Sequence, residues 1–443
     1  MGVLLSLGLT TAIFAYYYKD PDPAGHSTAP TGLTTYGIAL LPLSLPLLIF
    51  AEPISKLVLG DGSHAYLFQW IVIASILFNF NGFSLAIFRA QRRPGQYIII
   101  TITTTAMTLG GTVYLVAALH QDVTGVILAR LVAAAAGTVA AMWLTWRAFV
   151  GHVRWDTCRR MLRFGLPLVP TTLIGMIITM SDRFFLKHYA TLADVGVYGL
   201  GWRLASIVSF LLVQPMDIAL PPAIYAAEGQ DYARDFYKHV PTYALFAAAM
   251  LWLGIAMLSP EIVRIMATAD YSGAVRIIPL VCLGLALSAL QGPMSQGLSL
   301  ARRSEFFLLA AAVGAAVSAG GNLVLVPRYG ATGAALSSVA AWIAVIAARY
   351  VTSRAIYPLP VEWLRFAKII ATAGGLYAVA WCIPSSPLWL ALALKVVLWA
   401  AFPFALWALR LYHPHELSQM ALIVAKARGR AVSDTSDVHP PEP

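Results

Sequence analysis

The chain has 443 residues, of which 59% are hydrophobic and 11% are charged. Soluble globular domains carry about 25% charged residues, so this composition excludes an ordinary soluble enzyme or binding domain and indicates a polytopic membrane protein. The net charge of +10 would suggest a nucleic-acid partner in a soluble protein. Here the basic residues lie between apolar segments, which is typical of membrane topology signals, so we expect no nucleic acid.

Thirteen apolar segments approach or exceed the length of about 20 residues that a helix needs to cross a bilayer. We predict an all-α polytopic fold, because the short linkers leave no room for a soluble domain. The three cysteines are scattered and show no metal-ligand or disulfide spacing, so we expect no metal site. The predicted spans are 2–18, 33–51, 65–88, 97–119, 123–146, 164–189, 195–221, 240–258, 275–300, 306–326, 331–352, 365–383 and 388–411.

Basic residues predict the orientation of the chain. Most of the 30 Lys and Arg residues fall in the connections that follow odd-numbered segments, and Arg349 is assigned to one of these connections. An excess of Lys and Arg marks the cytoplasmic side of a membrane protein, so we expect a cytoplasmic C-terminus. The opposite connections hold only Lys56, Lys187, Arg264, Arg276 and Arg328.

The sequence also repeats itself about 210 residues further along the chain. Arg92-Arg93 recurs as Arg302-Arg303, and Asn81-Gly82 in the third segment corresponds to Gln291-Gly292 in the ninth. Each segment of the first half corresponds to the segment six places later in chain order. We therefore expect two halves of the same orientation, related by an axis along the membrane normal.

Sliding the second half back by this offset leaves the sixth segment without a counterpart. We therefore predict two pseudo-symmetric six-helix bundles, of which the first lacks its first helix, followed by a trailing helix pair. A complete relative would have fourteen membrane-spanning helices, against thirteen here. The predicted divisions are a first bundle at 1–150, a second at 151–355, the trailing pair at 356–412 and a polar, proline-rich, partly disordered cytoplasmic tail at 413–443.

Several short runs carry a family resemblance. Phe-Gly-Leu-Pro at 164–167 opens the second half, and Asp182-Arg183-Phe-Phe-Leu186 and Val195-Gly-Val-Tyr198 follow it. With the repeat, the trailing pair and the Arg-Ala-Gln-Arg-Arg run at 89–93, these residues resemble the polysaccharide-biosynthesis branch of the multidrug/oligosaccharidyl-lipid/polysaccharide (MOP) flippase superfamily. O-antigen flippases of lipopolysaccharide assembly belong to that branch.

The resemblance implies a transporter and not an enzyme, with no cofactor, in the cytoplasmic (inner) membrane of a bacterium. It implies that the protein moves an undecaprenyl-diphosphate-linked oligosaccharide from the cytoplasmic to the outer leaflet by alternating access. The expected partners are this lipid-linked oligosaccharide, membrane lipid, a coupled proton or sodium ion, and other polysaccharide-assembly proteins.

Charged residues inside membrane-length segments are costly and usually mark a water-filled path or a bound ligand. Arg130, Arg183 and Arg203 lie at similar depth from the outer side. We predict that they face one cavity and bind the diphosphate and glycan, because a guanidinium donates paired hydrogen bonds to phosphate. Alternatively, Arg130 snorkels to the headgroups, and Arg183 forms a local ion pair with Asp182 or a helix-end contact that orients the hairpin of the sixth and seventh segments. Lys395, in the last segment, is expected to snorkel.

Two carboxylates are candidates for ion coupling. Asp182 and Asp217 lie within predicted spans, and a membrane-embedded carboxylate can bind a proton or a sodium ion. A helix-end contact with Arg234 is the alternative for Asp217. Three amides are predicted as polar cavity linings or helix bends, with interhelical packing as the alternative: Asn81, Gln214 and Gln291.

Other functions remain open at this point. A lipid II-type flippase fits fourteen helices and a cationic cavity equally well, and a drug/cation antiporter of the same superfamily is the nearer rival in fold. A membrane enzyme of glycan assembly fits less well. Such an enzyme needs a sizeable outer loop or acidic residues held at a membrane face for acid/base or metal chemistry, and the outer connections here are short.

Overall fold

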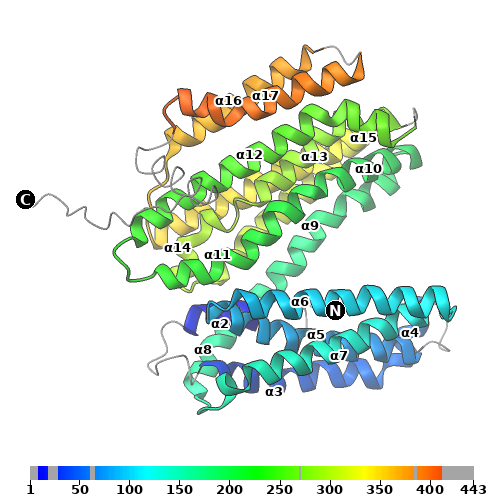
Figure 1. Cartoon of the computed structure of the whole chain (residues 1–443), viewed down its shortest axis with the longest axis vertical. Coiled ribbons are helices and arrows are strands. Elements are labelled where there is room, and N and C mark those ends of the chain that lie inside the picture. Colours follow the sequence, from blue (N-terminus) through cyan, green and yellow to red (C-terminus); the bar gives the residue numbers. More distant parts are fainter. Residues whose placement is uncertain (1–7, 18–27, 60–64, 269–270, 384–386, 412–443) are drawn as a thin grey trace, which may run out of the picture.

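The computed structural model describes residues 8–17, 28–59, 65–268, 271–383 and 387–411. All regular secondary structure in these residues is helical. Nine of the described helices are long and apolar enough to cross a membrane. The protein is therefore an all-α, multi-pass membrane protein, as predicted. Figure 1 shows two helical bundles side by side, with a helix pair on the far side of the second bundle.

The first bundle packs around a core formed by α2, α3, α5 and α8, with Ile13, Phe83 and Met161 fully buried in it. The predicted division at 150/151 would assign α8 to the second bundle, but α8 packs on α2 and α3. The elements are α2 (Leu9–Tyr17), α3 (Thr28–Ile49), α4 (Ala51–Leu59), α5 (Ala65–Ala90), α6 (Pro94–Val113), the π-helical η2 (Tyr114–Ala118), α7 (Asp122–Phe149) and α8 (Trp155–Gly165).

The second bundle begins with α9, which lies along α15. Thr191 and Asp194 form a reciprocal capping box that starts α10. Gly330, with φ of 53°, breaks the 52-residue α15 into two helices where the sequence predicts two spans. The elements are α9 (Leu168–Tyr189), α10 (Leu192–Val208), the π-helical η3 (Ser209–Val213), α11 (Gln214–Ala227), α12 (Ala233–Met266), α13 (Ala274–Ser288), the 3-10 turn η5 (Pro293–Ser295), α14 (Gln296–Leu300) and α15 (Glu305–Ile356).

The predicted repeat is visible in the helix bounds. The segment from α13 to α14 starts 209 residues after α5 and ends 210 residues after it. The first half of α15 likewise starts 211 residues after α6. The backbone repeats in detail as well, because Arg92 and Arg302 both adopt the left-handed conformation with φ of 54°. The two bundles are therefore copies of one helix arrangement.

The trailing pair consists of α16 (Trp363–Trp381) and α17 (Leu388–Ala408), and both helices pack on α12. Lys395 Nζ of α17 lies 2.6 Å from Glu261 Oε1 of α12, and the two side chains are 4% and 1% exposed. The expectation that Lys395 snorkels to the membrane surface is therefore wrong. The ammonium group stays inside the protein because a carboxylate from the neighbouring bundle neutralises it.

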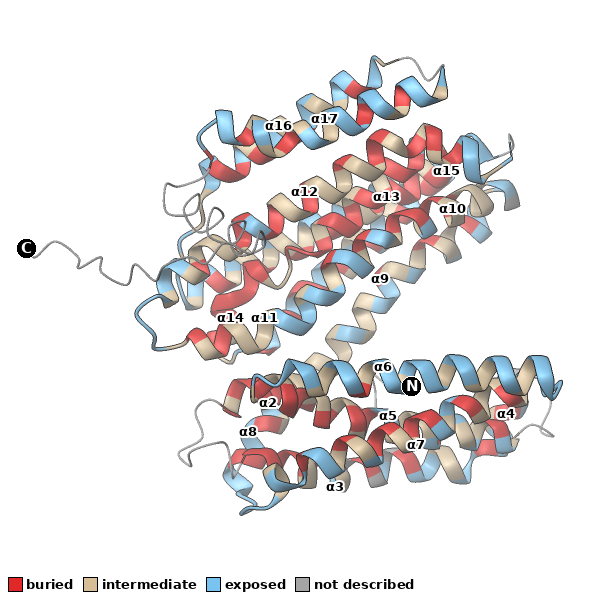
Figure 2. Ribbon diagram, viewed as in Figure 1, coloured by how far each residue is buried: buried red, intermediate tan, exposed pale blue. Residues whose placement is uncertain are grey.

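The two bundles meet at the end of the molecule that carries Arg92, Arg93, Arg160, Arg302 and Arg303, which we call the basic end. There α2 packs on α11 and α8 packs on α9 (Figure 1). Figure 2 shows that burial is concentrated inside each bundle: α13 is largely buried, whereas α6 is exposed along most of its length. A cavity at the junction of the bundles is lined mainly by α9, α11 and the segment from the end of α13 to α14.

Candidate functional site

A cavity of about 340 Å³ lies at the junction of the two bundles. Thr11 of α2 and Phe164 of α8 contribute from the first bundle, and the rest of the wall comes from the second. The polar part of the wall consists of Thr11, Thr171, Thr172, Asp217, Gln291, Ser295, Ser299, Tyr225 and Arg349. The cavity thus combines one carboxylate, one guanidinium and several hydroxyl groups inside an otherwise apolar molecule.

Arg349, on the second half of α15, is buried with 9% of its surface exposed. Its Nη1 donates to the carbonyl oxygen of Gln291 at 3.4 Å, and its guanidinium lies 5.1 Å from the ring centre of Phe307. Its Nε has no hydrogen-bond partner in the described structure. Arg349 is the one cationic residue in the described wall of the cavity.

Asp217 lies in the first turn of α11 and is open to the same cavity. The helix that carries it is irregular: the π-helical segment Ser209–Val213 precedes α11, and Pro215 follows Gln214 directly. Short π-helical insertions often occur at functional sites, where they shift the direction of the following side chains. This irregular segment brings Asp217 to the cavity wall, while Gln214 is exposed and is not part of it.

Gln291 lies where the chain between α13 and α14 is not regular α-helix, and it is one of the residues that line the cavity. The neighbouring Gly292 allows close packing, since an added Cβ atom would lie 3.2 Å from Leu220 Cδ2 of α11. The structure therefore brings together Asp217 and Gln291, both predicted as site residues, and adds Arg349 to them.

Asp182 of α9 lies in a second polar cluster, inside the second bundle, and is 2% exposed. Its carboxylate accepts hydrogen bonds from the Tyr198 hydroxyl of α10 and from Asn322 Nδ2 of α15, the latter at 3.1 Å. Ser318 continues the cluster, 3.2 Å from the Ser181 hydroxyl. Three helices thus converge on one buried carboxylate, and Asp182 and Tyr198, from two separate sequence runs, are in contact.

Arg183 is not the partner of this carboxylate among the described ion pairs. Its guanidinium lies 4.5 Å from the ring centre of Trp202, which is a cation–π contact. Arg183 thus contacts an aromatic ring, while the neighbouring Asp182 carboxylate is hydrogen-bonded by hydroxyl and amide donors.

The three arginines predicted to bind substrate do not line the cavity of Asp217 and Arg349. Arg130 lines a different hollow of about 550 Å³, between α5, α6 and α7 of the first bundle. Arg203 is exposed on α10. The structure thus places Arg130 and Arg203 on different bundles.

Asn81 is buried inside the first bundle, in α5. Its side chain packs closely against Gly137 of α7, because a Cβ atom added at Gly137 would lie only 3.0 Å from Asn81 Nδ2. It does not line the junction cavity, and α5 runs unbroken through this position. The corresponding Gln291 lies at a break in its helix, so the two equivalent amides occupy different environments.

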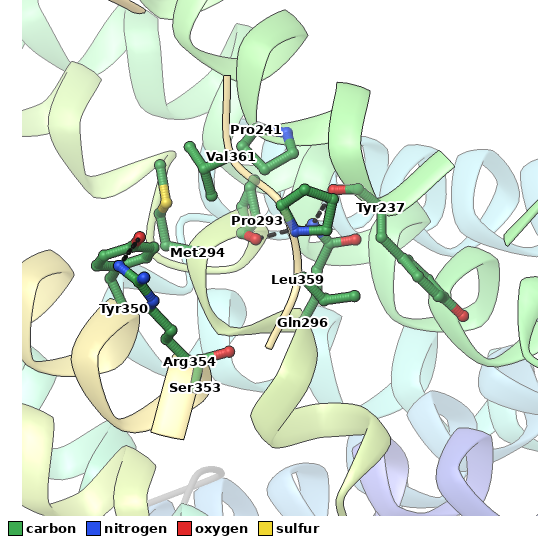
Figure 3. A pocket seen from close by; sticks show the side chains of 11 residues that line it. Tyr237, Pro241, Pro293, Met294, Gln296, Tyr350, Ser353, Arg354, Leu359 and Val361 are labelled. Carbon is green, nitrogen blue, oxygen red and sulfur yellow. Dashed lines mark hydrogen bonds between the residues drawn. The ribbon is translucent and has the colours of Figure 1, made fainter. Parts of the chain in front are cut away.

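A smaller cavity of about 10 Å³ lies at the basic end (Figure 3). Leu359 and Val361, from the linker before α16, lie beside Pro293 and Gln296, and Gln296 Nε2 donates to the carbonyl oxygens of Pro293 and Tyr237 at 2.8 and 3.2 Å. This volume holds about one water molecule. The cavity is therefore packing around the linker and has no room for a substrate.

Among the described residues, no group of three or more His, Cys, Asp or Glu side chains is placed to hold a metal ion. The feature that sequence reasoning missed is Arg349. The sequence pattern treats it as a topology signal in a connection, although the predicted span 331–352 contains it. That position inside a span was the signal that could have identified it.

Comparisons with known proteins agree on family and fold. The model of a family described as polysaccharide biosynthesis protein matches residues 4–276. No curated protein matches the chain.

Among solved structures, the chain is similar to the Vibrio cholerae MATE transporter VcmN in the bent form, with a TM-score of 0.64 and 17% identity over 85% of this chain and 86% of that one. It is also similar to the lipid II flippase MurJ in an inward closed conformation, with a TM-score of 0.59 and 12% identity over 90% and 88%. An outward-facing MATE family transporter of the MOP superfamily gives a TM-score of 0.64 and 15% identity over 84% and 85%. The fold is that of MOP transporters, and the chain belongs to the polysaccharide biosynthesis protein family.

Proposed function

We propose that this protein transports an undecaprenyl-diphosphate-linked oligosaccharide from the cytoplasmic to the outer leaflet of a bacterial inner membrane. The family membership and the MOP fold support a transporter. The lipid-linked substrate is a proposal that rests on the chemistry of the junction cavity, on the family description and on the likeness to a lipid II flippase.

The observation that carries the proposal is the buried Arg349 in the wall of the junction cavity. A guanidinium keeps its charge in apolar surroundings and binds phosphate through paired hydrogen bonds. The hydroxyl groups of Thr171, Thr172 and Ser295 line the same cavity and suit the hydroxyl groups of a sugar. A diphosphate joined to a glycan matches both parts of the wall.

Alternating access requires two bundles that can separate at one membrane face while closing at the other. Here the bundles touch at the basic end, through α2 with α11 and α8 with α9. In our proposal the basic end faces the cytoplasm, following the excess of arginine there, and the C-terminus lies on that side. The contacts at the basic end then form the cytoplasmic gate in its closed state.

Asp182 is our proposed ion-coupling residue. Its carboxylate is buried among the hydroxyl and amide groups of three helices, a setting in which binding of a proton or sodium ion would change the packing of α9 against α10 and α15. Asp217, which shares the cavity of Arg349, is proposed to respond to the substrate. A drug/cation antiporter would use the same carboxylate but would not need Arg349.

Complementation of a strain that lacks a polysaccharide flippase tests the proposal. We expect the wild-type chain to restore surface glycan, and Arg349→Gln to lose most of that export while its level in the membrane stays unchanged. Arg354→Gln is the matched control, because Arg354 lies on the same helix but is exposed. Full export by Arg349→Gln, or resistance to cationic drugs without glycan export, would contradict the proposed substrate.

A further inference from the structure

Besides the junction cavity, a hollow of about 310 Å³ lies at the basic end, between the two bundles. Arg89 near the end of α5 and Arg92 in the turn after it form the first-bundle side, and Tyr232 and Phe236 lie on the second-bundle side. None of its lining residues is acidic; the others are Pro222, Ala223, Ala226 and Ala227. The hollow thus holds two cationic side chains and an apolar wall, with no carboxylate to balance them.

Arg89 is held in a fixed position with donor capacity to spare. Its Nη1 donates to the carbonyl oxygen of Ile218 in α11 at 3.1 Å, and its guanidinium lies 4.9 Å from the ring centre of Phe14. Its Nε is buried and has no partner in the described structure. These contacts orient the guanidinium, and no ion pair among the described residues neutralises its charge.

In the second bundle, the arginine of the equivalent turn, Arg302, has hydrogen-bond and ion-pair partners. Arg302 has the same left-handed backbone as Arg92, with φ of 54° for both. Arg302 Nε and Nη2 donate to the carbonyl oxygen of Ala15 at 2.9 and 2.7 Å, and Glu228 lies 3.5 Å from Nη2. Arg92 is exposed at the edge of the hollow, and no described residue takes the place that Ala15 and Glu228 take for Arg302.

We propose that Arg89 and Arg92 form a binding site for a phosphate group, which loads the diphosphate of the lipid-linked substrate at the basic end. The inference rests on the proposed function and adds a site distinct from the cavity of Arg349. Two guanidinium groups provide the paired donors that a diphosphate accepts. The alanine, proline and phenylalanine wall accommodates the start of a prenyl chain, so the site suits a headgroup still attached to its lipid.

Binding of farnesyl diphosphate and of inorganic diphosphate to the purified full chain tests the site. We expect Arg92→Gln to weaken farnesyl diphosphate binding by about tenfold or more, as expected for the loss of one charge-assisted contact. Arg93→Gln is the matched control, because Arg93 is the exposed neighbour that does not line the hollow. Arg92→Lys should fall between the wild type and Arg92→Gln, since it keeps the charge without the planar fork.

The two probes distinguish the source of the phosphate. Tighter binding of farnesyl diphosphate than of inorganic diphosphate supports a lipid headgroup, and equal binding supports a site for free phosphate. Equal affinity in the wild type and Arg92→Gln, or equal losses in Arg92→Gln and Arg93→Gln, would overturn the site.

The site and the proposed function can fail separately. If the wild type exports glycan and Arg92→Gln binds and exports as well as the wild type, the site is wrong and the function stands. If binding depends on Arg92 but the wild type exports no glycan in complementation, the function is wrong and the site stands.

Discussion

The two bundles share one helix arrangement, but equivalent positions in α15 and α6 make different hydrogen bonds. In the second bundle, Asp182 of α9 accepts hydrogen bonds from Tyr198 of α10 and Asn322 of α15, so this cluster joins three helices. The positions 210 residues earlier than Ser318 and Asn322 are Thr108 and Thr112 in α6. Their hydroxyl groups donate to carbonyl oxygens four residues back in their own helix, at 2.8 and 2.6 Å.

This difference shows that duplication preserved the scaffold while the chemistry diverged. A threonine hydroxyl that bonds within its own helix needs no hydrogen-bond partner from a neighbouring helix. The first bundle accordingly has a hollow of about 550 Å³ beside Thr104, Thr108 and Arg130. The buried carboxylate of the second bundle requires donors from its neighbours. We therefore expect ion-dependent behaviour to depend on the second bundle alone.

The largest expected effect concerns the buried pair that joins the trailing helices to the second bundle. Lys395→Met leaves Glu261 as an uncompensated buried charge, which costs about 3–5 kcal/mol. Thermal unfolding in detergent should show a large fall in Tm. Lys56→Met is the control in the first bundle: Lys56 and Glu52 are also 2.6 Å apart, but they are 60% and 63% exposed. A similar fall in both variants would contradict a special role for burial.

The next effect concerns ion dependence. Asp182→Asn removes the charge but keeps a similar shape, and we expect about a tenfold loss of ion-stimulated transport, equivalent to roughly 1.4 kcal/mol. Transport into proteoliposomes under imposed proton and sodium gradients measures it. Thr108→Val changes the position equivalent to Ser318 in the first bundle and should have no effect. If only Thr108→Val altered ion dependence, the assignment to the second bundle would be wrong.

Asp217→Asn tests whether the carboxylate in the junction cavity acts on the substrate and not on the ion. Asp217 shares its cavity with Arg349, so we expect this variant to change the apparent KM for the proposed lipid-linked substrate by a few-fold and to leave the response to the ion gradient intact. The measurement is the same transport assay at varied substrate. Loss of the ion response in Asp217→Asn with a normal response in Asp182→Asn would exchange the roles of the two carboxylates.

The smallest effect concerns packing inside the first bundle. A Cβ atom at Gly137 would lie 2.5 Å from Thr104 Oγ1 and 3.0 Å from Asn81 Nδ2. Gly137→Ala should therefore destabilise the protein by about 1 kcal/mol. Gly320→Ala in α15 is the opposite case, because an added Cβ atom there meets nothing within 4 Å and alanine favours the helix. Stabilisation by Gly137→Ala would show that Asn81 is not held against α7.

Much of the fold could be predicted because its signals are local. Long apolar runs, glycine and proline at their edges, and the recurrence of Arg92-Arg93 as Arg302-Arg303 identified the helices and the repeat. The candidate site was predicted only in part. Asp217 and Gln291 share the cavity, but Arg130, Arg183 and Arg203 do not line it, since depth along a helix does not tell which way a side chain points.

The sequence by itself determined the membrane class, the helices, the repeat and the family, because hydrophobicity and helix formation depend on residues close together in the chain. Only the tertiary structure decided the partners of the charged residues. Lys395 meets Glu261, and Asp182 meets Tyr198 and Asn322. A buried charge is tolerated only where distant helices bring it an opposite charge or hydrogen-bond partners, and that meeting is a property of the packed bundle.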